Sequence, residues 1–427
     1  MKGLLKSIAV SILAWDAKHI LAKYNPKVIA VIGSVGKTGT KDAIHTALNG
    51  SLSVRKSKKS LNSDMGVPLT VIGCESGWSN PFKWLGIFAH GLMLIFLKNT
   101  YPEWLVLEVG MDKPGEMRGI AKWLKPDIVV ITSLPTIPVH VANFNSVEDV
   151  IQEKLSIAHA LKPDGTFILN GDDEKIKEVM GAFEQKKIFY TKDNITSAIQ
   201  YTDEKPLGMQ FTIKTISGNV EVLLRGILGE QLSYLVLATL SVCEVLNLDV
   251  KKCARALQNY EAPSGRMKII EGIENTTIID DSYNSSPIAL AAALDALDKL
   301  QMKGKKIAVL GDMRELGEFS EREHAKAGEH AAEVVDMLIT IGEESKVLAT
   351  AAHSAGLAKE NIKSFGYYDS IKAGEYVRGI LKDSDVVLVK GSQNKIRTER
   401  VVKAIMEQPE RAPELLVRQE REWLNRK

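Results

Sequence analysis

A glycine-rich turn near the start of the chain has the residue types that bind a phosphate group. An apolar run at 28–32 leads directly into Gly33-Ser34-Val35-Gly36-Lys37-Thr38. Glycines let backbone N–H groups approach phosphate oxygens, and a helix that begins there adds partial positive charge. We expect Lys37 to contact the β- and γ-phosphates of a nucleotide and the Thr38 hydroxyl to bind Mg²⁺. The segment therefore predicts a nucleotide-phosphate site.

This loop departs from the standard phosphate-loop pattern at one position. The pattern G-x-x-x-x-G-K-[ST] has glycine five residues before Gly36, where this chain has Val31. A Gly-Lys-Thr tripeptide alone occurs often by chance, and it could be a structural turn with a surface lysine. The strand-like run before it and the helix-like segment after it favour the phosphate site.

The elements that must position this loop follow an α/β alternation. Apolar strand-like runs recur, and several are followed by glycine and then by helix-like sequence, which is typical of parallel sheets covered by helices. Shorter alternating segments at 209–215 and 220–225 predict antiparallel strands appended to the first sheet. The expected parallel strands are 28–32, 104–109, 128–132, 166–169, 307–310, 337–341 and 386–389.

We predict an α/β protein with two large domains. Residues 27–264 form a central nucleotide-binding domain with a mainly parallel sheet, and residues 265–427 form a second, Rossmann-like α/β domain. The last twenty or so residues are rich in charge and predict a solvated helix. The other expected helices are 229–248, 287–300, 322–334 and 370–382.

Two apolar segments lie outside this alternation. Residues 1–26 predict an amphipathic helix, and residues 84–97 predict a second apolar helix; each apolar stretch is short of the ~20 residues that span a bilayer. The first helix could pack on the neighbouring domain or contact a membrane surface, helped by its lysines. Its expected apolar face consists of Leu4, Leu5, Ile8, Ile12, Trp15 and Ile20.

Composition excludes several functional classes. Hydrophobic residues make up 45% and charged residues 25% of the 427 residues, as in an ordinary folded domain. A net charge of +2 gives no basic field, so we expect no nucleic-acid partner. Cys74, Cys243 and Cys253 lack metal-ligand spacing, which indicates a reducing compartment. We therefore expect a cytoplasmic protein, in solution or peripheral at the inner face of the membrane.

Seven short segments after the phosphate loop carry a family resemblance. They occur in one order along the chain, and together with the loop they resemble the Mur ligases, which add amino acids to the peptidoglycan precursor. The resemblance runs from about residue 28 to residue 400 and is strongest to the subgroup that adds D-alanyl-D-alanine. The segments are 61–70, 108–116, 169–173, 265–267, 280–287, 310–317 and 389–392.

The resemblance implies a reaction and its cofactors. ATP phosphorylates a substrate carboxylate, an amine attacks the acyl phosphate, and ADP and phosphate leave. Such phosphoryl transfer depends on positioning and charge neutralisation more than on a protein nucleophile. ATP and two Mg²⁺ ions are therefore the expected cofactors.

The resemblance also assigns catalytic and metal-binding roles. Glu108, at a strand end, and Thr38 are implied Mg²⁺ ligands, and His140 matches a histidine that contacts a metal ion. Lys154 matches a lysine carried as a carbamate, an anion that can bind Mg²⁺ where an ammonium cannot. Asn62 is implied to face the reacting carboxylate.

Two residues beside these positions depart from the family pattern. Ser133 stands where the family usually has Asn, and Glu153 stands where a small residue precedes the modified lysine. Both departures affect the surroundings of the expected metal site rather than the ligands themselves.

The remaining assignments concern the nucleotide and the incoming amine. The resemblance implies that Asn170 lies near the adenine, that Arg266 reaches the phosphates and that Asp281 contacts the ribose. Loops at the carboxyl ends of strands bind ligands in open α/β sheets, so we expect the amine substrate in the last domain. The residues expected at this substrate cleft are Asn284, Asp312, Glu315 and Lys390.

The short segment before the phosphate loop leaves the acceptor open. Only 32 residues precede Gly33, too few to enclose a nucleotide-sugar, so we expect the subgroup's N-terminal UDP-binding domain to be missing. The chain could bind a UDP-linked muramoyl peptide through its central domain, act on a different carboxylate such as a lipid-linked or cofactor precursor, or rely on a partner. A third reading is a non-catalytic nucleotide-binding protein, against which the joint presence of the expected site residues argues.

Overall fold

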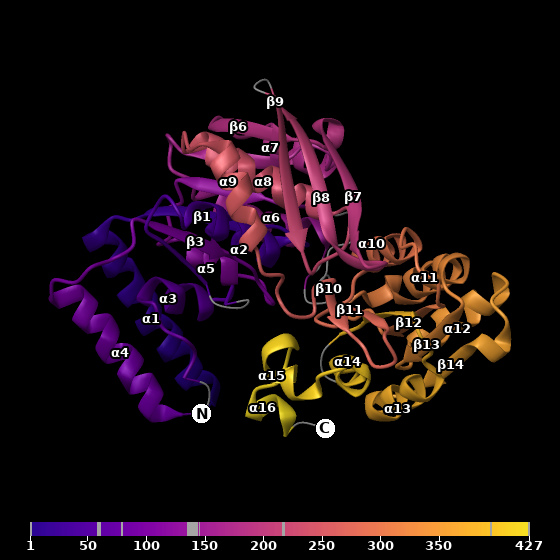
Figure 1. The fold of residues 1–427 in the computed structure, drawn as a ribbon. Helices are drawn as coiled ribbons and strands as arrows, with labels where there is room; N and C mark the ends of the chain where they lie inside the picture. The colour runs from indigo at the N-terminus through magenta and orange to yellow at the C-terminus, as the bar shows by residue number, and fades with distance from the viewer. Residues whose placement is uncertain are drawn as a thin grey trace. The chain divides into compact units, whose positions relative to one another are not determined.

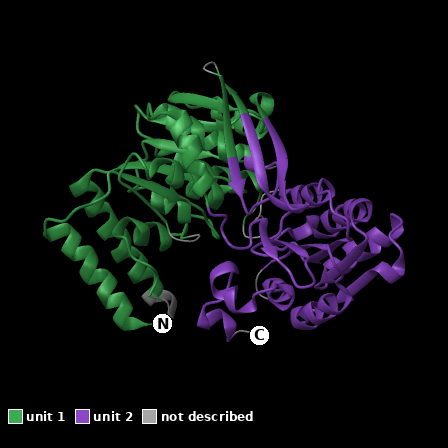
Figure 2. Ribbon diagram, in the orientation of Figure 1, with its two compact units in different colours: residues 1–195, 213–222, 233–260 green, residues 196–212, 223–232, 261–427 purple. Residues whose placement is uncertain are grey.

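The computed structural model describes residues 2–57, 61–77, 80–134, 144, 146–215, 218–392 and 395–425. They divide into two compact units (Figures 1 and 2), one of residues 1–195, 213–222 and 233–260 and the other of residues 196–212, 223–232 and 261–427. The sequence places the domain boundary near residue 264, and the chain passes finally into the second unit at residue 261.

A six-stranded sheet forms the centre of the first unit. Its order is β2-β3-β1-β4-β5-β6, and every neighbouring pair is parallel, as the sequence predicts. Parallel strands place their carboxyl ends at one edge, so the loops after β1, β3, β4 and β5 meet there. The strands are β1 (Lys27–Ile32), β2 (Val54–Lys56), β3 (Trp104–Glu108), β4 (Ile128–Ile131), β5 (Thr166–Asn170) and β6 (Lys186–Tyr190).

Helices cover this sheet and bury its apolar residues. Successive strand side chains point to opposite faces, and Val28, Ala30 and Ile32 of β1 share a core cluster with Leu13 and Ile20. The helices are α1 (Lys2–Tyr24), α2 (Lys37–Leu48), α3 (Gly66–Ile72), α4 (Pro81–Phe96), α5 (Glu116–Ala121), α6 (Val147–His159), α7 (Glu174–Met180), α8 (Leu232–Val245) and α9 (Val250–Ala256).

Three further strands form a separate sheet in the order β7-β8-β9. Asp203 and Glu204, the two residues between β7 and β8, both have positive φ, at 51° and 66°. This is the backbone of a type I′ hairpin turn, so β7 and β8 are antiparallel. The strands are β7 (Ile195–Thr202), β8 (Lys205–Thr215) and β9 (Gly218–Arg225), and Figure 2 shows them divided between the two units.

The second unit is built on another six-stranded sheet, in the order β10-β11-β15-β12-β13-β14. Only β10, at the edge, runs antiparallel to its neighbour. The strands are β10 (Lys268–Glu271), β11 (Thr277–Asp281), β12 (Lys306–Gly311), β13 (Met337–Ile341), β14 (Ile362–Phe365) and β15 (Val386–Lys390). The longer helices are α10 (Pro287–Asp298), α11 (Ser320–Val334), α12 (Ser345–Ser354), α13 (Ser370–Ile380) and α14 (Glu399–Ile405). The predicted α/β class and all seven predicted parallel strands are confirmed.

The chain end does not form the predicted solvated helix. Among its described residues the helices are short: a 3₁₀ turn at Pro409–Arg411, α15 (Ala412–Leu415) and α16 (Arg421–Leu424). Arg418 between them is buried, pairs with Glu399 and donates hydrogen bonds to the carbonyls of Ser282 and Tyr283. The prediction was wrong because charge was taken as a sign of exposure, whereas this arginine is buried with an ion-pair partner.

The apolar face predicted for the N-terminal helix is also wrong. Ile20 is fully buried, whereas Ile8, Ile12 and Trp15 are 49%, 40% and 45% exposed. Burial instead follows Leu13, Ala17 and Ile20, with the spacing of one helix face. The helix is apolar on both sides, and only one side packs on the core. None of the described helices has the length and apolar character needed to cross a membrane.

Candidate active site

The loop between β1 and α2 adopts a conformation that requires glycine at two positions. Gly33 has φ 141°, and a Cβ placed there would lie 2.1 Å from Oγ1 of Thr132. Gly36 has φ 83° and precedes the first residue of α2. Both values fall in the region that side chains disfavour. The predicted strand–loop–helix arrangement is therefore present, with Lys37 and Thr38 opening the helix.

The segment after β4 supports this loop. The backbone N–H of Ser34 donates to the Ser133 carbonyl at 3.0 Å, and that of Val35 donates to Ser133 Oγ at 3.1 Å. Thr132 Oγ1 donates to the Val35 carbonyl at 2.6 Å. The hydroxyl that replaces the expected Asn thus holds the phosphate loop directly. No pattern in the sequence indicates this role of Ser133 or that of Thr132.

Two lysines converge on the first glycine of the loop. Nζ of Lys37 lies 2.9 Å from the Gly33 carbonyl oxygen, and Nζ of Lys154 on α6 lies 3.1 Å from the same atom. Lys154 is only 4% exposed, and its burial, with the nearby charge of Lys37, holds the pKa of its amine well below the usual range. The structure thus brings together Lys37 and Lys154, which are 117 positions apart in the sequence.

Glu108, at the end of β3, has one carboxylate oxygen that accepts a hydrogen bond and one that does not. Oε1 accepts a hydrogen bond from Nδ2 of Asn62 at 2.8 Å. Oε2 is buried and has no hydrogen-bond partner among the described residues. A buried carboxylate oxygen without a donor is costly, and a hard cation such as Mg²⁺ satisfies it. The site therefore fits a metal ion, and Asn62, expected to face the reacting carboxylate, lies beside Glu108.

Glu153, the second departure from the family pattern, has a structural role. It is 2% exposed and accepts a hydrogen bond from the backbone N–H of Arg118 at 3.0 Å. Its carboxylate also lies 3.5 Å from the Arg118 guanidinium. These contacts fasten the start of α5 to α6, directly before Lys154.

Asn170, at the end of β5, braces two loops. Its Nδ2 donates to the Thr132 carbonyl at 3.1 Å, and its Oδ1 accepts from the Asp172 N–H at 3.0 Å. Tyr190 is the partner of Asn170 on the neighbouring strand β6, and its ring centroid lies 6.4 Å from that of Tyr234. Burial and the neighbouring Asp172 raise the pKa of Tyr234 to about 12. This tyrosine pair was not singled out from the sequence, because its members come from strand β6 and helix α8 and isolated aromatic residues usually indicate core packing.

In the second unit, Arg266 follows a strained turn. Gly265 has φ 68°, and its N–H donates to the Asp280 carboxylate at 3.1 Å. Burial raises the pKa of Asp280 to about 6. The Arg266 guanidinium lies 4.1 Å from the centre of the Tyr283 ring, a cation–π contact that fixes its plane.

Three residues with separate predicted roles form one cluster. Nζ of Lys390 lies 2.5 Å from the Asp281 carboxylate and 3.1 Å from the Asn284 carbonyl oxygen. Lys390 is 1% exposed and Asp281 is 6% exposed. A carboxylate expected at the nucleotide and a lysine expected at the amine substrate are therefore paired with each other.

Asp312, directly after β12, holds its loop in place through a backbone hydrogen bond. It is 1% exposed, and one carboxylate oxygen accepts from the Ser345 N–H at 2.8 Å. The next N–H, of Met313, donates to Nε2 of the fully buried His324 at 2.9 Å. Glu315 follows in the same loop with φ 65°. His324 was missed because a histidine within an amphipathic helix gives no sign of its contacts.

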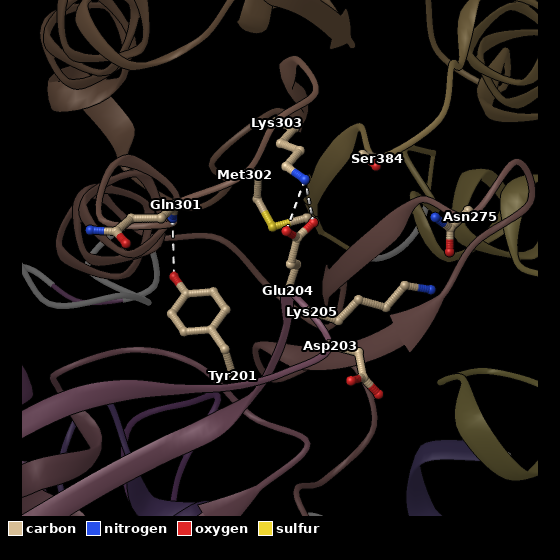
Figure 3. Close-up of a pocket in the computed structure, with 9 residues that line it drawn as sticks. All are labelled: Tyr201, Asp203, Glu204, Lys205, Asn275, Gln301, Met302, Lys303 and Ser384. Atoms are coloured by element: carbon tan, nitrogen blue, oxygen red, sulfur yellow. Dashed lines mark hydrogen bonds and ion pairs between the residues drawn. The ribbon is translucent and has the colours of Figure 1, made fainter.

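One cavity in the second unit lies away from these residues. It has a volume of about 430 Å³ and is lined by Tyr201, Glu204, Asn275, Lys303 and Ser384 among others (Figure 3). Three of these precede β11, β12 and β15, so the cavity is at the edge where the parallel strands begin. Ligands of open α/β sheets bind at the opposite edge. This cavity is therefore not the candidate site.

His140 lies outside the described residues, so its predicted metal contact is not tested. Within the part of the chain that the structure describes, no group of three or more His, Cys, Asp or Glu side chains is arranged to hold a metal ion.

Comparison with known families matches most of the chain. Residues 31–243 match the Mur ligase middle domain, and residues 265–393 match the family described as Mur ligase, glutamate ligase domain. The chain is 29% identical to UDP-N-acetylmuramoyl-tripeptide--D-alanyl-D-alanine ligase of Bacillus subtilis, with 92% of this chain and 79% of that protein covered. The Escherichia coli ligase of the same name is 27% identical over the same shares.

Solved structures give the same picture. The crystal structure of MurF ligase from Thermotoga maritima in complex with ADP has a TM-score of 0.72 and 25% identity, covering 92% of this chain and 83% of that one. MurF from Acinetobacter baumannii has a TM-score of 0.70 at 22% identity, covering 90% and 77%, and supports the fold alone.

Proposed function

Because the chain belongs to the Mur ligase family, we propose that it is an ATP-dependent, ADP-forming ligase that joins a carboxylate to an amine. The proposed reaction adds D-alanyl-D-alanine to a muramoyl tripeptide in peptidoglycan precursor synthesis, the activity named for its bacterial relatives. The carboxylate takes the γ-phosphoryl group of ATP, and the amine then displaces phosphate from the acyl carbon.

One observation carries this proposal: two lysines from separate elements meet at the first glycine of the phosphate loop. Nζ of Lys37 and of Lys154 both lie within 3.1 Å of the Gly33 carbonyl oxygen. The polyphosphate of ATP is a strong anion, and the Lys37 ammonium held beside the glycine N–H groups favours its binding, while Lys154 places a buried amine next to the same loop. A structural glycine turn with a surface lysine would need neither the second lysine nor its burial.

The proposed active form of Lys154 is a carbamate. Its lowered pKa increases the share of neutral amine, and the neutral amine has the lone pair that adds to CO₂ with loss of one proton. The product is an anionic oxygen ligand of the kind that Mg²⁺ prefers. With Thr38, Glu108 and His140 it makes the proposed ligand set for two ions. Bound Mg²⁺ supplies charge neutralisation at the transferred phosphoryl group.

The other assigned residues bind and orient the reactants. In the proposed complex, Lys37 moves from the loop carbonyls to the β- and γ-phosphates, and Asn62 orients the reacting carboxylate through its amide. Arg266, already held flat against an aromatic ring, contacts the phosphates. Asn170 lies near the adenine, and Asp281 contacts the ribose.

The incoming D-alanyl-D-alanine is proposed to bind at the second unit. Asn284, Asp312, Glu315 and Lys390 follow the carboxyl ends of β11, β12 or β15, where open α/β sheets bind ligands. The attacking amine must be neutral, and it loses a proton as the amide forms. We propose the cytoplasm as the place of reaction, at the inner face of the membrane.

The test is ADP release by the purified full chain with ATP and Mg²⁺. UDP-linked muramoyl tripeptide and D-alanyl-D-alanine are supplied separately and together, and Lys37→Ala is the control. Release that requires both substrates, with the amide product found by mass spectrometry and the Lys37→Ala rate at least ~10³-fold lower, supports the proposal.

Each alternative gives a different result. Nucleotide binding without turnover on these substrates, but with turnover on a lipid-linked or cofactor carboxylate, would replace the acceptor and keep the ligase chemistry. Nucleotide binding with no turnover on any carboxylate and amine would leave a non-catalytic nucleotide-binding protein.

A further inference from the structure

Exposed apolar side chains gather on two neighbouring helices of the first unit. Among the described residues, fourteen large hydrophobic side chains are exposed, and nine of them belong to α1, α4 or Leu97 directly after α4. Phe82 and Phe96 of α4 are 83% and 73% exposed, and Trp15 of α1 is 45% exposed. Figure 1 shows α1 and α4 side by side. An apolar surface of this kind on a folded domain marks a binding surface.

The pattern on α4 is regular. Its exposed apolar residues are spaced by three or four positions or by seven, two helical turns, with Met93 next to Leu92, and so form a stripe along one side of the helix. The opposite side, with Ile87, Gly91 and Leu94, is buried. A helix at a water-facing surface carries charge on its outer side, but no Asp or Glu occurs in α4. The stripe consists of Phe82, Leu85, Leu92, Met93 and Phe96.

The two helices are held together at defined points. Gly91 of α4 lies against Asp16 of α1, where a Cβ would come within 2.6 Å of the carboxylate. Nζ of Lys23, near the end of α1, donates to the carbonyls of Leu94, at 2.8 Å, and Leu97, at 2.5 Å. Because the second contact lies further along both helices than the first, the helices run in the same direction. The amine of Lys23 binds the carbonyls at the end of α4. The stripe is therefore the outer surface of a fixed helix pair.

Among the described side chains of α1 and α4, the exposed charges have one sign. Lys6 and Lys18 of α1 and Lys83 and Lys98 at the two ends of α4 are exposed. The only carboxylate in the sequence of either helix is Asp16, which is 1% exposed. Lysines at the border of an apolar stripe complement the anionic surface of a membrane. A second copy of the chain would instead bring like charges together.

The dimensions favour a helix pair that lies on the membrane. The sixteen residues of α4 extend for about 24 Å, less than the ~30 Å hydrocarbon core. None of the described helices is suited to cross a membrane. We propose that α1 and α4 form a membrane-docking surface, in which the α4 stripe enters the interfacial region and the lysines contact anionic lipid headgroups.

The test is co-sedimentation of the full chain with vesicles, which needs no substrate and is independent of the proposed reaction. Vesicles of phosphatidylcholine are compared with vesicles that also contain phosphatidylglycerol. We expect binding to the anionic vesicles that weakens as salt is raised. The triple variant Phe82→Ser, Leu85→Ser, Phe96→Ser should lower the partition coefficient by at least about tenfold, because each side chain gives up apolar burial.

A matched control separates this surface from general exposure. Ile371 and Leu424 of the second unit are 55% and 52% exposed, and Ile371→Ser with Leu424→Ser should leave vesicle binding unchanged. Substitution of Lys83 and Lys98 by Gln should remove the preference for anionic vesicles. Circular dichroism checks that each variant is folded.

Three results would overturn the proposal. The first is no binding of the unsubstituted chain to either kind of vesicle. The second is equal binding to neutral and anionic vesicles. The third is concentration-dependent self-association, measured by light scattering, that the triple variant abolishes while vesicle binding is unaffected; it would assign the stripe to contact between copies.

Discussion

The two units each bury a lysine beside their candidate site, and they treat its charge differently. Lys154 of the first unit is 4% exposed, and its amine donates to the carbonyl of Gly33, where a second lysine also donates. Lys390 of the second unit is 1% exposed, and its amine lies 2.5 Å from the Asp281 carboxylate. One lysine has a carbonyl and a neighbouring cation; the other has a counter-ion.

We infer from this difference that Lys154 is kept for chemistry, whereas Lys390 also has a structural role at its proposed binding site. An ammonium buried without a counter-ion costs several kcal/mol, so the protein must deprotonate or modify it. The lowered pKa of Lys154 indicates that it does. Lys390 is already neutralised, and it ties the loop after β11 to the end of β15. The same substitution, Lys→Met, should therefore affect activity in the first unit and stability in the second.

The largest expected effect is that of Lys154→Met on activity. Methionine keeps the length and apolar stem of lysine but cannot form a carbamate. We expect kcat/KM to fall at least ~10³-fold, because the proposed metal ligand at the phosphoryl-transfer site is lost. The free energy of unfolding in urea should not fall, because the substitution removes a buried amine that has no counter-ion. A large loss of stability would contradict the proposed difference between the two lysines.

Carbamate formation also predicts a dependence on CO₂ and pH. Activity should fall when bicarbonate is removed and recover when it is returned, and labelled bicarbonate should give a carbamate signal in ¹³C NMR spectra. Because burial lowers the pKa of Lys154, the neutral amine persists to lower pH than on the surface. Further acidification protonates it, so the signal should disappear as pH falls. The Lys154→Met variant should show no signal at any pH.

The next largest effect is that of Lys390→Met on stability. The substitution leaves the Asp281 carboxylate buried without its cation, and we expect the free energy of unfolding of the second unit to fall by about 3 kcal/mol. The double variant Asp281→Asn, Lys390→Met should recover at least half of this loss, since no charge then stays unpaired. Equal losses in the single and double variants would show that the pair has no coupling energy.

A buried acid in the first unit also tests the cost of burying a charge without a partner, here for a negative charge. Asp16 is 1% exposed, neither of its oxygens has a hydrogen-bond partner among the described residues, and burial raises its pKa to about 6. The folded state thus holds a proton that the unfolded state releases at its lower pKa. The stability that the protonated Asp16 carboxyl contributes is present at low pH and is lost as pH rises through about 6.

Hydrogen exchange of the α1 amides measures this effect. After correction for intrinsic exchange rates, we expect the α1 amides to exchange more slowly at about pH 5 than at about pH 8. Asp16→Asn should remove most of the difference and stabilise the helix at the higher pH by about 1 kcal/mol. An unchanged pH dependence in Asp16→Asn would assign it to another group, of which His19 is the nearest candidate.

The sequence predicts most where a local pattern determines the structure. All seven expected parallel strands, the loop with Lys37 and the helix at 84–97 follow from apolar runs and glycines. The pairing of Lys154 with the Gly33 carbonyl and of Glu108 with Asn62 was expected only as a shared site from the family resemblance. Local patterns cannot show such contacts, because they depend on the order of strands in the sheet.

The failed predictions come from reading polarity as exposure. Arg418 is charged and buried because Glu399 lies beside it, and Ile8 is apolar and exposed although it lies on a helix that packs on the core. Burial depends on what the other elements place nearby. Asp281 and Lys390, which the resemblance assigns to different ligands, are paired with each other in the structure, and no local pattern in the sequence indicates this pair.

Ser133 gives the smallest expected effect and tests how a departure from the family pattern is accommodated. Its hydroxyl accepts the Val35 N–H at 3.1 Å and so fixes the phosphate loop from the end of β4. Ser133→Ala should cost about 1 kcal/mol of loop stability, the value of one such hydrogen bond, and raise KM for ATP about fivefold with little change in kcat. Ser133→Asn, the usual family residue, should restore most of the affinity, because its side-chain oxygen can accept the same bond. Titration of ATP against the three proteins measures the affinity. If Ser133→Asn did not restore the affinity for ATP, the Ser133 hydroxyl would be specific to this loop and not equivalent to the family Asn.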